Sequence, residues 1–319
     1  MNEVVFSSKP KMKYVGIATQ QSRNNMKSLL FLIAYPLLVL FLLFIGSHLF
    51  SYFIGVEYEE TIPANDLFIF LFPWVTICII IWFIIAYITN VKIVDYATGA
   101  QPLERKENRR VYNLVENLSI SCGMRTPKIH IIESGALNAF ASGLNHESYT
   151  ITLTRGIIDK LDDKELEGVI AHELTHIRNN DVQVLIISIV FVGIFALLAE
   201  ISMRSWRVVR NGKQVYVMII MFLLAAVGYC VAMIMRFAIS RNREYMADAG
   251  AAELTKNPLA LAGALRKISG NSTMSSVQTE AVAQLFIDHH PNPLNASFLT
   301  SLYATHPPIE DRIKVLEQF

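Results

Sequence analysis

Charged side chains are scarce in this chain: Asp, Glu, Lys and Arg make up 17% of its 319 residues, whereas hydrophobic residues make up 53%. Soluble globular domains carry about 25% charged residues. This composition therefore argues against an ordinary soluble protein. The net charge of +1 carries no information about nucleic acid, and we expect no nucleic-acid partner.

Cysteine is also scarce, with three residues that lie far apart at Cys78, Cys122 and Cys230. Scattered cysteines of this kind do not make a disulfide framework, as expected for a protein of a reducing compartment. Each of them is expected to be a small core residue. The chain also lacks an evident internal repeat.

Most of the hydrophobic residues fall into four runs, each of which reaches the ~20 residues needed to cross a bilayer. The runs predict transmembrane helices over residues 28–54 and 67–91, and a hydrophobic hairpin of two membrane helices over residues 182–237. The first run is too long for a signal-peptide core and has no small-residue cleavage site. It is therefore expected to remain as an anchor.

Charge is distributed unevenly around the first two runs. Residues 1–27 are basic, residues 55–66 are acidic and contain no Lys or Arg, and basic residues return after residue 91. The positive-inside rule places residues 1–27 in the cytoplasm and residues 55–66 outside. Residues 92–181 are then expected to form the first part of a cytoplasmic domain.

The third and fourth runs do not follow this rule as simply. The loop between them contains Arg204, Arg207, Arg210 and Lys213, and a short basic loop resists translocation. Either the hairpin crosses the bilayer against the rule, or it dips into the bilayer without crossing it. Both alternatives return residues 238–319 to the cytoplasmic side, where they form the second part of the domain.

The local sequence predicts a helix over residues 163–179, directly before the third run. Asp162 is a good N-cap, and Glu165 three residues later completes a variant of the capping box. Apolar residues then recur at helical spacing. This helix carries the sequence His-Glu-Leu-Thr-His at residues 172–176.

Two imidazoles four residues apart on a helix project from one face, close enough to bind one metal ion. The pattern therefore predicts His172 and His176 as ligands of one Zn²⁺ ion per subunit. Glu173 then lies near any water on that ion, and we expect it to act as the general base of peptide hydrolysis.

A catalytic zinc usually takes three protein ligands and keeps a further position for water. Glu244 is the best candidate for the third ligand, because the hydrophobic hairpin returns the chain beside the first ligand helix just before it. Asp248, one helical turn later, is predicted to accept a hydrogen bond from the outer nitrogen of a ligand histidine. For both carboxylates, a solvated helical charge is the alternative.

Further elements are expected around this site. Residues 103–122 read as an amphipathic helix, and Asn257-Pro258 as the start of a helix that continues over residues 259–268. Short strands are expected over residues 128–133, 138–142 and 148–153.

Together these features resemble the HtpX family, integral-membrane zinc metalloproteases of bacterial membrane-protein quality control. The resemblance covers nearly the whole chain and rests on Asn-Ala-Phe-Ala-Ser-Gly at 138–143, Ala-His-Glu-Leu-Thr-His at 171–176, the basic segment 241–248 and Thr-His-Pro at 305–307. It implies an α+β membrane protein, mainly helical, in which a zincin-like catalytic domain with a small β-sheet accompanies four hydrophobic helices.

The resemblance also implies roles for individual residues. It assigns His172, His176 and Glu244 as zinc ligands and Glu173 as the catalytic base. It makes Arg312 and His306 functional candidates, with His306 either stabilising the oxyanion or occupying the fourth zinc position at rest. The substrate edge strand that it implies contains Asn138, Ala139, Phe140 and Ala141.

The expected function is cleavage of misfolded or damaged membrane proteins at the cytoplasmic face of a bacterial cell membrane. The partners are then these substrates and the lipid bilayer, and the sequence does not decide whether the protein forms an oligomer. One alternative is a prenyl-protein endopeptidase, which would need a larger intramembrane chamber and more spans. The other is a non-enzymatic scaffold or holdase with a structural metal, which has no need of Glu173.

Overall fold

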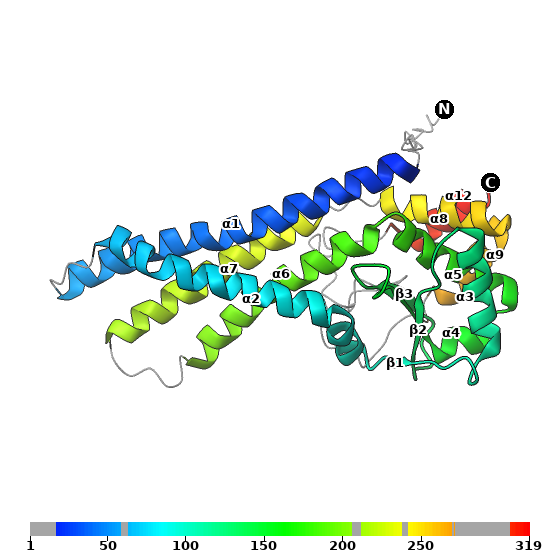
Figure 1. Ribbon diagram of the computed structural model, residues 1–319, viewed down its shortest axis with the longest axis horizontal. Coiled ribbons are helices and arrows are strands. Elements are labelled where there is room, and N and C mark those ends of the chain that lie inside the picture. Colours follow the sequence, from blue (N-terminus) through cyan, green and yellow to red (C-terminus); the bar gives the residue numbers. More distant parts are fainter. Residues whose placement is uncertain (1–16, 59–62, 206–211, 238–241, 270, 272–306) are drawn as a thin grey trace, which may run out of the picture.

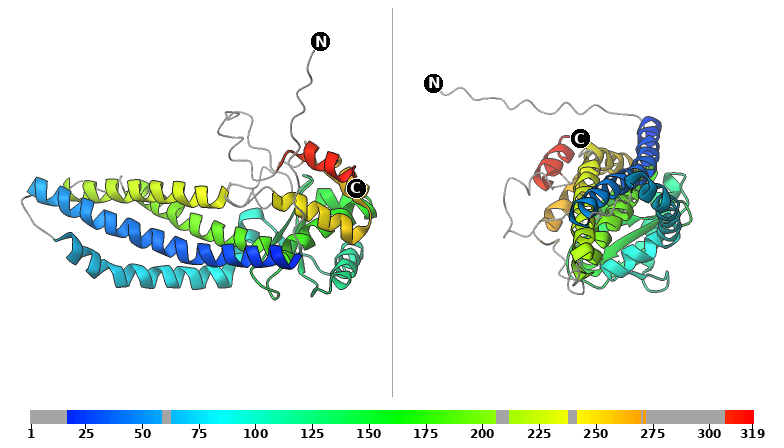
Figure 2. Two further views of the ribbon diagram at one scale, coloured as in Figure 1. Left: turned by 90° about the horizontal axis from the view of Figure 1, so that it is seen from above. Right: turned by 90° about the vertical axis from the view of Figure 1, so that its left-hand side faces the viewer.

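Two regions make up the molecule in the computed structural model, which describes residues 17–58, 63–205, 212–237, 242–269, 271 and 307–319 (Figure 1). One region is a bundle of four long helices. The other, called the globular part below, contains a small sheet and the shorter helices. The two views of Figure 2 show the same division.

The long helices form on the four apolar runs: α1 (Ile17–Tyr58), α2 (Ala64–Thr98), α6 (Asp181–Ser205) and α7 (Gly212–Phe237). Each contains a stretch long and apolar enough to cross a membrane. The 42 residues of α1 and the 35 of α2 correspond to about 63 and 52 Å of helix. Both are therefore longer than the ~30 Å hydrocarbon core of a bilayer.

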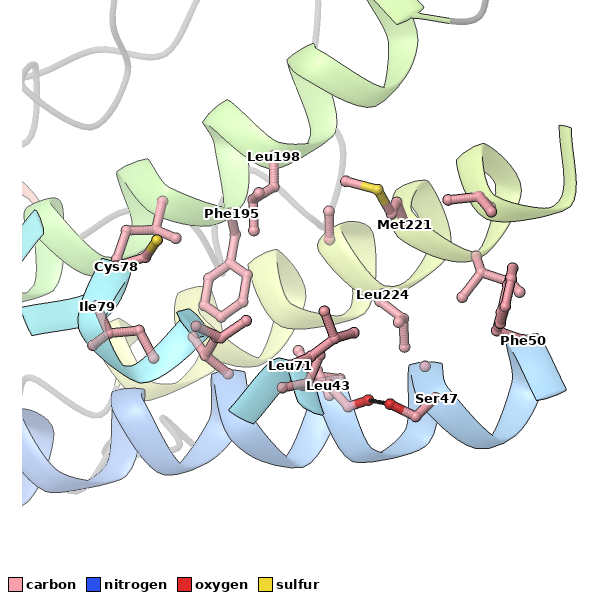
Figure 3. A pocket seen from close by; sticks show the side chains of 18 of the residues that line it. Leu43, Ser47, Phe50, Leu71, Cys78, Ile79, Phe195, Leu198, Met221 and Leu224 are labelled. Carbon is pink, nitrogen blue, oxygen red and sulfur yellow. Dashed lines mark hydrogen bonds between the residues drawn. The ribbon is translucent and has the colours of Figure 1, made fainter. Parts of the chain in front are cut away.

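An apolar cavity of about 590 Å³ lies among the four long helices (Figure 3). Its walls include Leu43, Leu71, Phe195 and Leu224, one residue from each helix. The Ser47 hydroxyl, which also lines it, donates to the Leu43 carbonyl at 2.9 Å. The cavity therefore offers almost no polar contact to an occupant.

The cysteines are not core residues, so that expectation is wrong. Cys78 and Cys230 are exposed, and Cys122 is half-buried. Cys78 lines the cavity among the four long helices, and Cys122 ends α3 in the globular part. For Cys230 on α7, the reason is that a membrane helix that faces lipid does not need protein around its apolar side chains.

The sheet of the globular part has the strand order β1-β2-β4-β3. Its strands are β1 (Gln101–Pro102), β2 (Lys128–Ile132), β3 (Ala139–Ser142) and β4 (Thr150–Thr154). β2 and β4 run parallel, and the other two pairs are antiparallel. The three predicted strands are confirmed, and β3 forms one edge of the sheet within the described residues.

The amphipathic helix begins later than predicted, because α3 spans Arg109–Ser121. The preceding residues join the sheet instead: β1 pairs with β2, and the Leu103 N–H donates to the Ile129 carbonyl at 2.9 Å. Asn108 then starts the helix, since its side chain accepts a hydrogen bond from the Val111 N–H.

Helix α5 (Asp163–Arg178) forms where a helix was predicted, and it runs through the centre of the globular part. Its capping box is formed: the Glu165 N–H donates to Asp162 Oδ1 at 2.9 Å, and the Asp162 N–H donates to Glu165 Oε2 at 3.0 Å. α5 packs against α3, β3 and β4, and also against α8 (Asn242–Thr255) and α9 (Pro258–Ile268).

The remaining helices are α4 (Arg155–Lys160) and α12 (Ile309–Leu316), the latter packed on α8 and α9. The start of α9 is confirmed, with Asn257 as the cap and Pro258 in the first turn. The predicted fold class is confirmed as a whole: the described residues form a mainly helical α+β membrane protein with a small sheet and four hydrophobic helices.

Candidate active site

Three predicted ligands from two helices meet in the globular part. His172 and His176 lie on α5, and Glu244 lies in the first turn of α8. The two histidine Nε2 atoms are 3.1 Å apart. The Glu244 carboxylate lies 3.7 Å from each, through Oε2 to His172 and through Oε1 to His176.

The donor set fits a zinc ion. Two imidazole nitrogens at ~2.0–2.1 Å from a tetrahedral zinc would lie about 3.3 Å apart, close to the observed 3.1 Å. All three ligand atoms lie within 4.8 Å of one another, and two nitrogens with one carboxylate is a ligand set found in catalytic zinc sites. The site is therefore suited to holding a zinc with a further position for water.

A glycine allows the two ligand helices to approach. At Gly250, an added Cβ would lie 2.5 Å from Thr175 Cγ2 and 2.9 Å from Thr175 Oγ1. The Thr175 hydroxyl is fixed by its hydrogen bond to the Ala171 carbonyl at 2.8 Å. No side chain fits in this space unless α8 moves away from α5.

We therefore predict that Gly250→Val weakens zinc binding at least tenfold, because it displaces Glu244 from the two histidines. The measurement is zinc affinity by competition with a chromophoric chelator. Gly193→Ala in α6 is the control, since its Cβ would meet nothing within 4 Å and zinc affinity should stay unchanged. Equal zinc affinity in wild type and Gly250→Val would show that the close approach of α8 to α5 at this glycine does not position Glu244.

Each histidine holds a carboxylate on its outer nitrogen. His172 Nδ1 lies 3.0 Å from Asp248 Oδ1, and His176 Nδ1 lies 3.0 Å from Asp181 Oδ2. Such a partner fixes the tautomer with hydrogen on Nδ1, which leaves the Nε2 lone pair for a metal. Sequence reasoning named Asp248 but missed Asp181; the available signal was an acidic residue just after the ligand helix.

The Asp248 carboxylate is also held by Arg312 of α12. Arg312 Nε donates to Asp248 Oδ2 at 2.9 Å and Nη2 donates to Oδ1 at 2.7 Å, a two-pronged ion pair. Burial opposes the charge on Asp248, but Arg312 outweighs it and lowers the pKa of Asp248 to about 2. Arg312 is 1% exposed, which differs from an arginine that only solvates a terminal helix.

Burial and neighbouring charges also shift the pKa values of Glu173 and His176. Burial raises the pKa of Glu173, which is 2% exposed on α5. A raised pKa brings a carboxylate closer to the range in which a general base works well. Burial opposes the charge on His176, but Glu244 and Asp181 outweigh it and raise its pKa to about 10. A metal at this histidine therefore competes with a proton.

The predicted edge strand lies beside the ligand helix. Ala139, Phe140 and Ala141 lie in β3, which packs against α5 and α6, and Asn138 precedes the strand. The Asn138 N–H donates to Thr154 Oγ1 at 3.0 Å. His306 lies outside the described residues.

The chain is similar to known peptidases. The model of peptidase family M48 matches residues 105–319. A protease HtpX homolog of Bacteroides fragilis (strain YCH46) is 56% identical over 97% of this chain and all of its own length. One of Thermoanaerobacter pseudethanolicus is 32% identical over 93% of this chain and 96% of its own.

Among solved structures, S. mikatae Ste24p is similar over 94% of this chain and 67% of its own, with 21% identity and a TM-score of 0.47. The sequence matches are far stronger than this structural likeness. The family match covers the whole globular part from α3 onward, and the relatives cover the membrane helices as well. The chain therefore belongs to peptidase family M48, as a membrane metalloprotease of the HtpX type.

Proposed function

We propose that this chain is a zinc endopeptidase that cleaves misfolded or damaged membrane proteins at the cytoplasmic face of a bacterial membrane. One observation carries the proposal: the cluster of His172, His176 and Glu244 lies at the end of the membrane bundle. Only two residues separate the end of α5 at Arg178 from the start of α6 at Asp181. Segments exposed beside the bilayer are then within reach of the site.

His172, His176 and Glu244 are the proposed zinc ligands, and Glu173 is the proposed base. A zinc ion held there would lower the pKa of its water toward ~7 and polarise the peptide carbonyl. Glu173 takes the proton of the attacking water and delivers it to the leaving amine. Asp248 and Asp181 keep the imidazoles oriented during these steps. For His306 we propose one of two roles: it stabilises the oxyanion, or it would serve as a fourth zinc ligand in the resting enzyme.

Substrate is proposed to add to the sheet along β3. An extended segment that pairs with an edge strand binds through backbone hydrogen bonds, and these do not depend on its sequence. β3 lies at the edge of the described sheet and packs on the ligand helix. This mode suits an enzyme whose substrates share exposure rather than a sequence motif.

The proposed topology has all four long helices crossing the bilayer, with the globular part in the cytoplasm. α6 and α7 have 25 and 26 residues, about 38 Å of helix each, which exceeds the ~30 Å core. The basic loop between them would then lie outside, against the positive-inside rule. The length of both helices favours this over a hairpin that only dips into the bilayer.

Labelling from each side of the membrane tests the topology. Met203, near the end of α6, is 62% exposed, and a Met203→Cys variant on a background without native cysteines presents one thiol there. We expect an impermeant maleimide to label it from outside in intact cells. Inverted vesicles expose the cytoplasmic face of the membrane. Labelling in these vesicles but not in intact cells would show that the hairpin does not cross the bilayer.

The substrate class is tested in cells. Membrane proteomes with the wild type and with Glu173→Gln should differ in membrane proteins that accumulate only with the variant. Identical proteomes under membrane-protein stress would contradict the proposal. Purified enzyme that cleaves prenylated peptides and leaves an unfolded membrane protein intact would favour the prenyl-protein alternative.

A further inference from the structure

The first membrane helix reaches the end of the ligand helix α5. The N-terminal turns of α1 carry polar side chains, and Gln21, Asn24 and Asn25 contact the end of α5 and the turn that joins it to α6. Gln21 Nε2 donates to the Arg178 carbonyl at 2.6 Å, and Asn24 Nδ2 donates to the Asn179 carbonyl at 2.8 Å. These carbonyls belong to the last turn of α5, where helical partners run out, so α1 supplies the missing donors.

Asn24 makes a second contact, which leads to the metal site. Its Nδ2 also donates to Asp181 Oδ1 at 2.7 Å, and the two hydrogens of one amide nitrogen serve both acceptors. Asp181 Oδ2 in turn lies 3.0 Å from His176 Nδ1. One carboxylate oxygen of Asp181 therefore contacts α1, and the other contacts a proposed zinc ligand.

This chain of contacts is shielded from water. Asn24 is 3% exposed and Asp181 is 2% exposed. Inside a protein, where the dielectric constant is low, each of these hydrogen bonds is stronger than at a surface, and an unpaired oxygen is costly. The orientation of the Asp181 carboxylate therefore depends on Asn24.

We propose that Asn24 is a positioning residue of the metal site: it fixes Asp181, and through Asp181 the His176 imidazole, so that docking of the first membrane helix sets zinc affinity. The inference rests on the proposed zinc site. It assigns to a membrane helix, 148 residues before the first ligand histidine, a part in holding the catalytic metal. Zinc is then held more tightly where α1 is docked.

The test measures zinc affinity of the full chain in detergent by competition with a chromophoric chelator. Loss of an outer partner of a ligand histidine typically weakens metal binding by ~10–100-fold. Because Asn24 is one bond further away, we expect Asn24→Ala to weaken it about tenfold. Asn25→Ala is the matched control: the exposed Asn25 only accepts a hydrogen bond from Asn180 Nδ2, and wild-type affinity is expected.

A double-mutant cycle separates positioning from general support of the fold. Asp181→Ala should weaken zinc binding by itself, and Asn24→Ala should add nothing in that background. Full additivity of the two effects, or wild-type zinc affinity in Asn24→Ala, would overturn the inference. Wild-type protein that binds no zinc would instead overturn the proposed function.

Unfolding of the zinc-free protein covers the case in which Asn24→Ala folds poorly. Asn24→Asp keeps the volume of the side chain but turns an acceptor toward Asp181, so it should also weaken zinc binding while it fills the same space. If the zinc-free forms of both variants unfold at temperatures well below that of the zinc-free wild type, Asn24 is a structural residue and the inference fails.

Discussion

Replacing Glu173 with glutamine is expected to lower the rate of peptide cleavage by ~10²–10⁴-fold and to leave zinc bound. The amide has nearly the shape of the carboxylate but accepts no proton from water. Zinc binding should survive because Glu173 is separate from the three ligand residues, which are His172, His176 and Glu244. The measurements are cleavage of an unfolded membrane protein and zinc content of the same preparation.

Glu167→Gln is the matched control for that variant. Glu167 lies on the same helix, is half-buried and stands outside the metal cluster, so cleavage should proceed at the wild-type rate. Wild-type cleavage by Glu173→Gln would remove the proposed base from the mechanism. Loss of zinc from Glu173→Gln would mean that its effect on cleavage says nothing about proton transfer.

Replacing Glu244 with alanine is expected to remove both zinc and activity. The carboxylate is the third ligand and the only proposed one with a negative charge, so two neutral imidazoles would remain. Loss of an outer partner already costs ~10–100-fold in affinity, and loss of a direct ligand should cost more. Zinc content after dialysis against a weak chelator measures the effect.

The control for Glu244→Ala is Glu253→Ala, which removes an exposed carboxylate from the same helix. It should keep zinc and activity. Contrasting behaviour of Glu173→Gln and Glu244→Ala is the stronger result, because one should lose only chemistry and the other should lose the metal. Full zinc content in Glu244→Ala would show that the third ligand lies elsewhere.

The helix that carries the zinc motif was predictable because its signals are local. The capping box of Asp162 and Glu165 and the apolar spacing that follows lie within one segment, and α5 forms there. Glu244 could be predicted as a ligand for a different reason. A hairpin must return to the side it left, so the first polar helix after it lies beside the helix before it.

Contacts between distant segments were not predictable in the same way. Asp181 is visible only as an acid after the motif, and its partner Asn24 precedes it by 157 residues. Arg312 lies 64 residues after Asp248, and nothing in its short helix shows that it is buried. The late start of α3 has a similar cause, since residues before Asn108 pair with a strand that follows later in the chain.

A crystal structure of the zinc-loaded protein, with anomalous data collected at the zinc absorption edge, tests the proposed metal site most directly. We expect one peak per chain, within ~2.0–2.2 Å of Nε2 of His172, Nε2 of His176 and the Glu244 carboxylate. A peak held by other residues, or no peak at these three in protein that still cleaves its substrate, would contradict the proposed metal site.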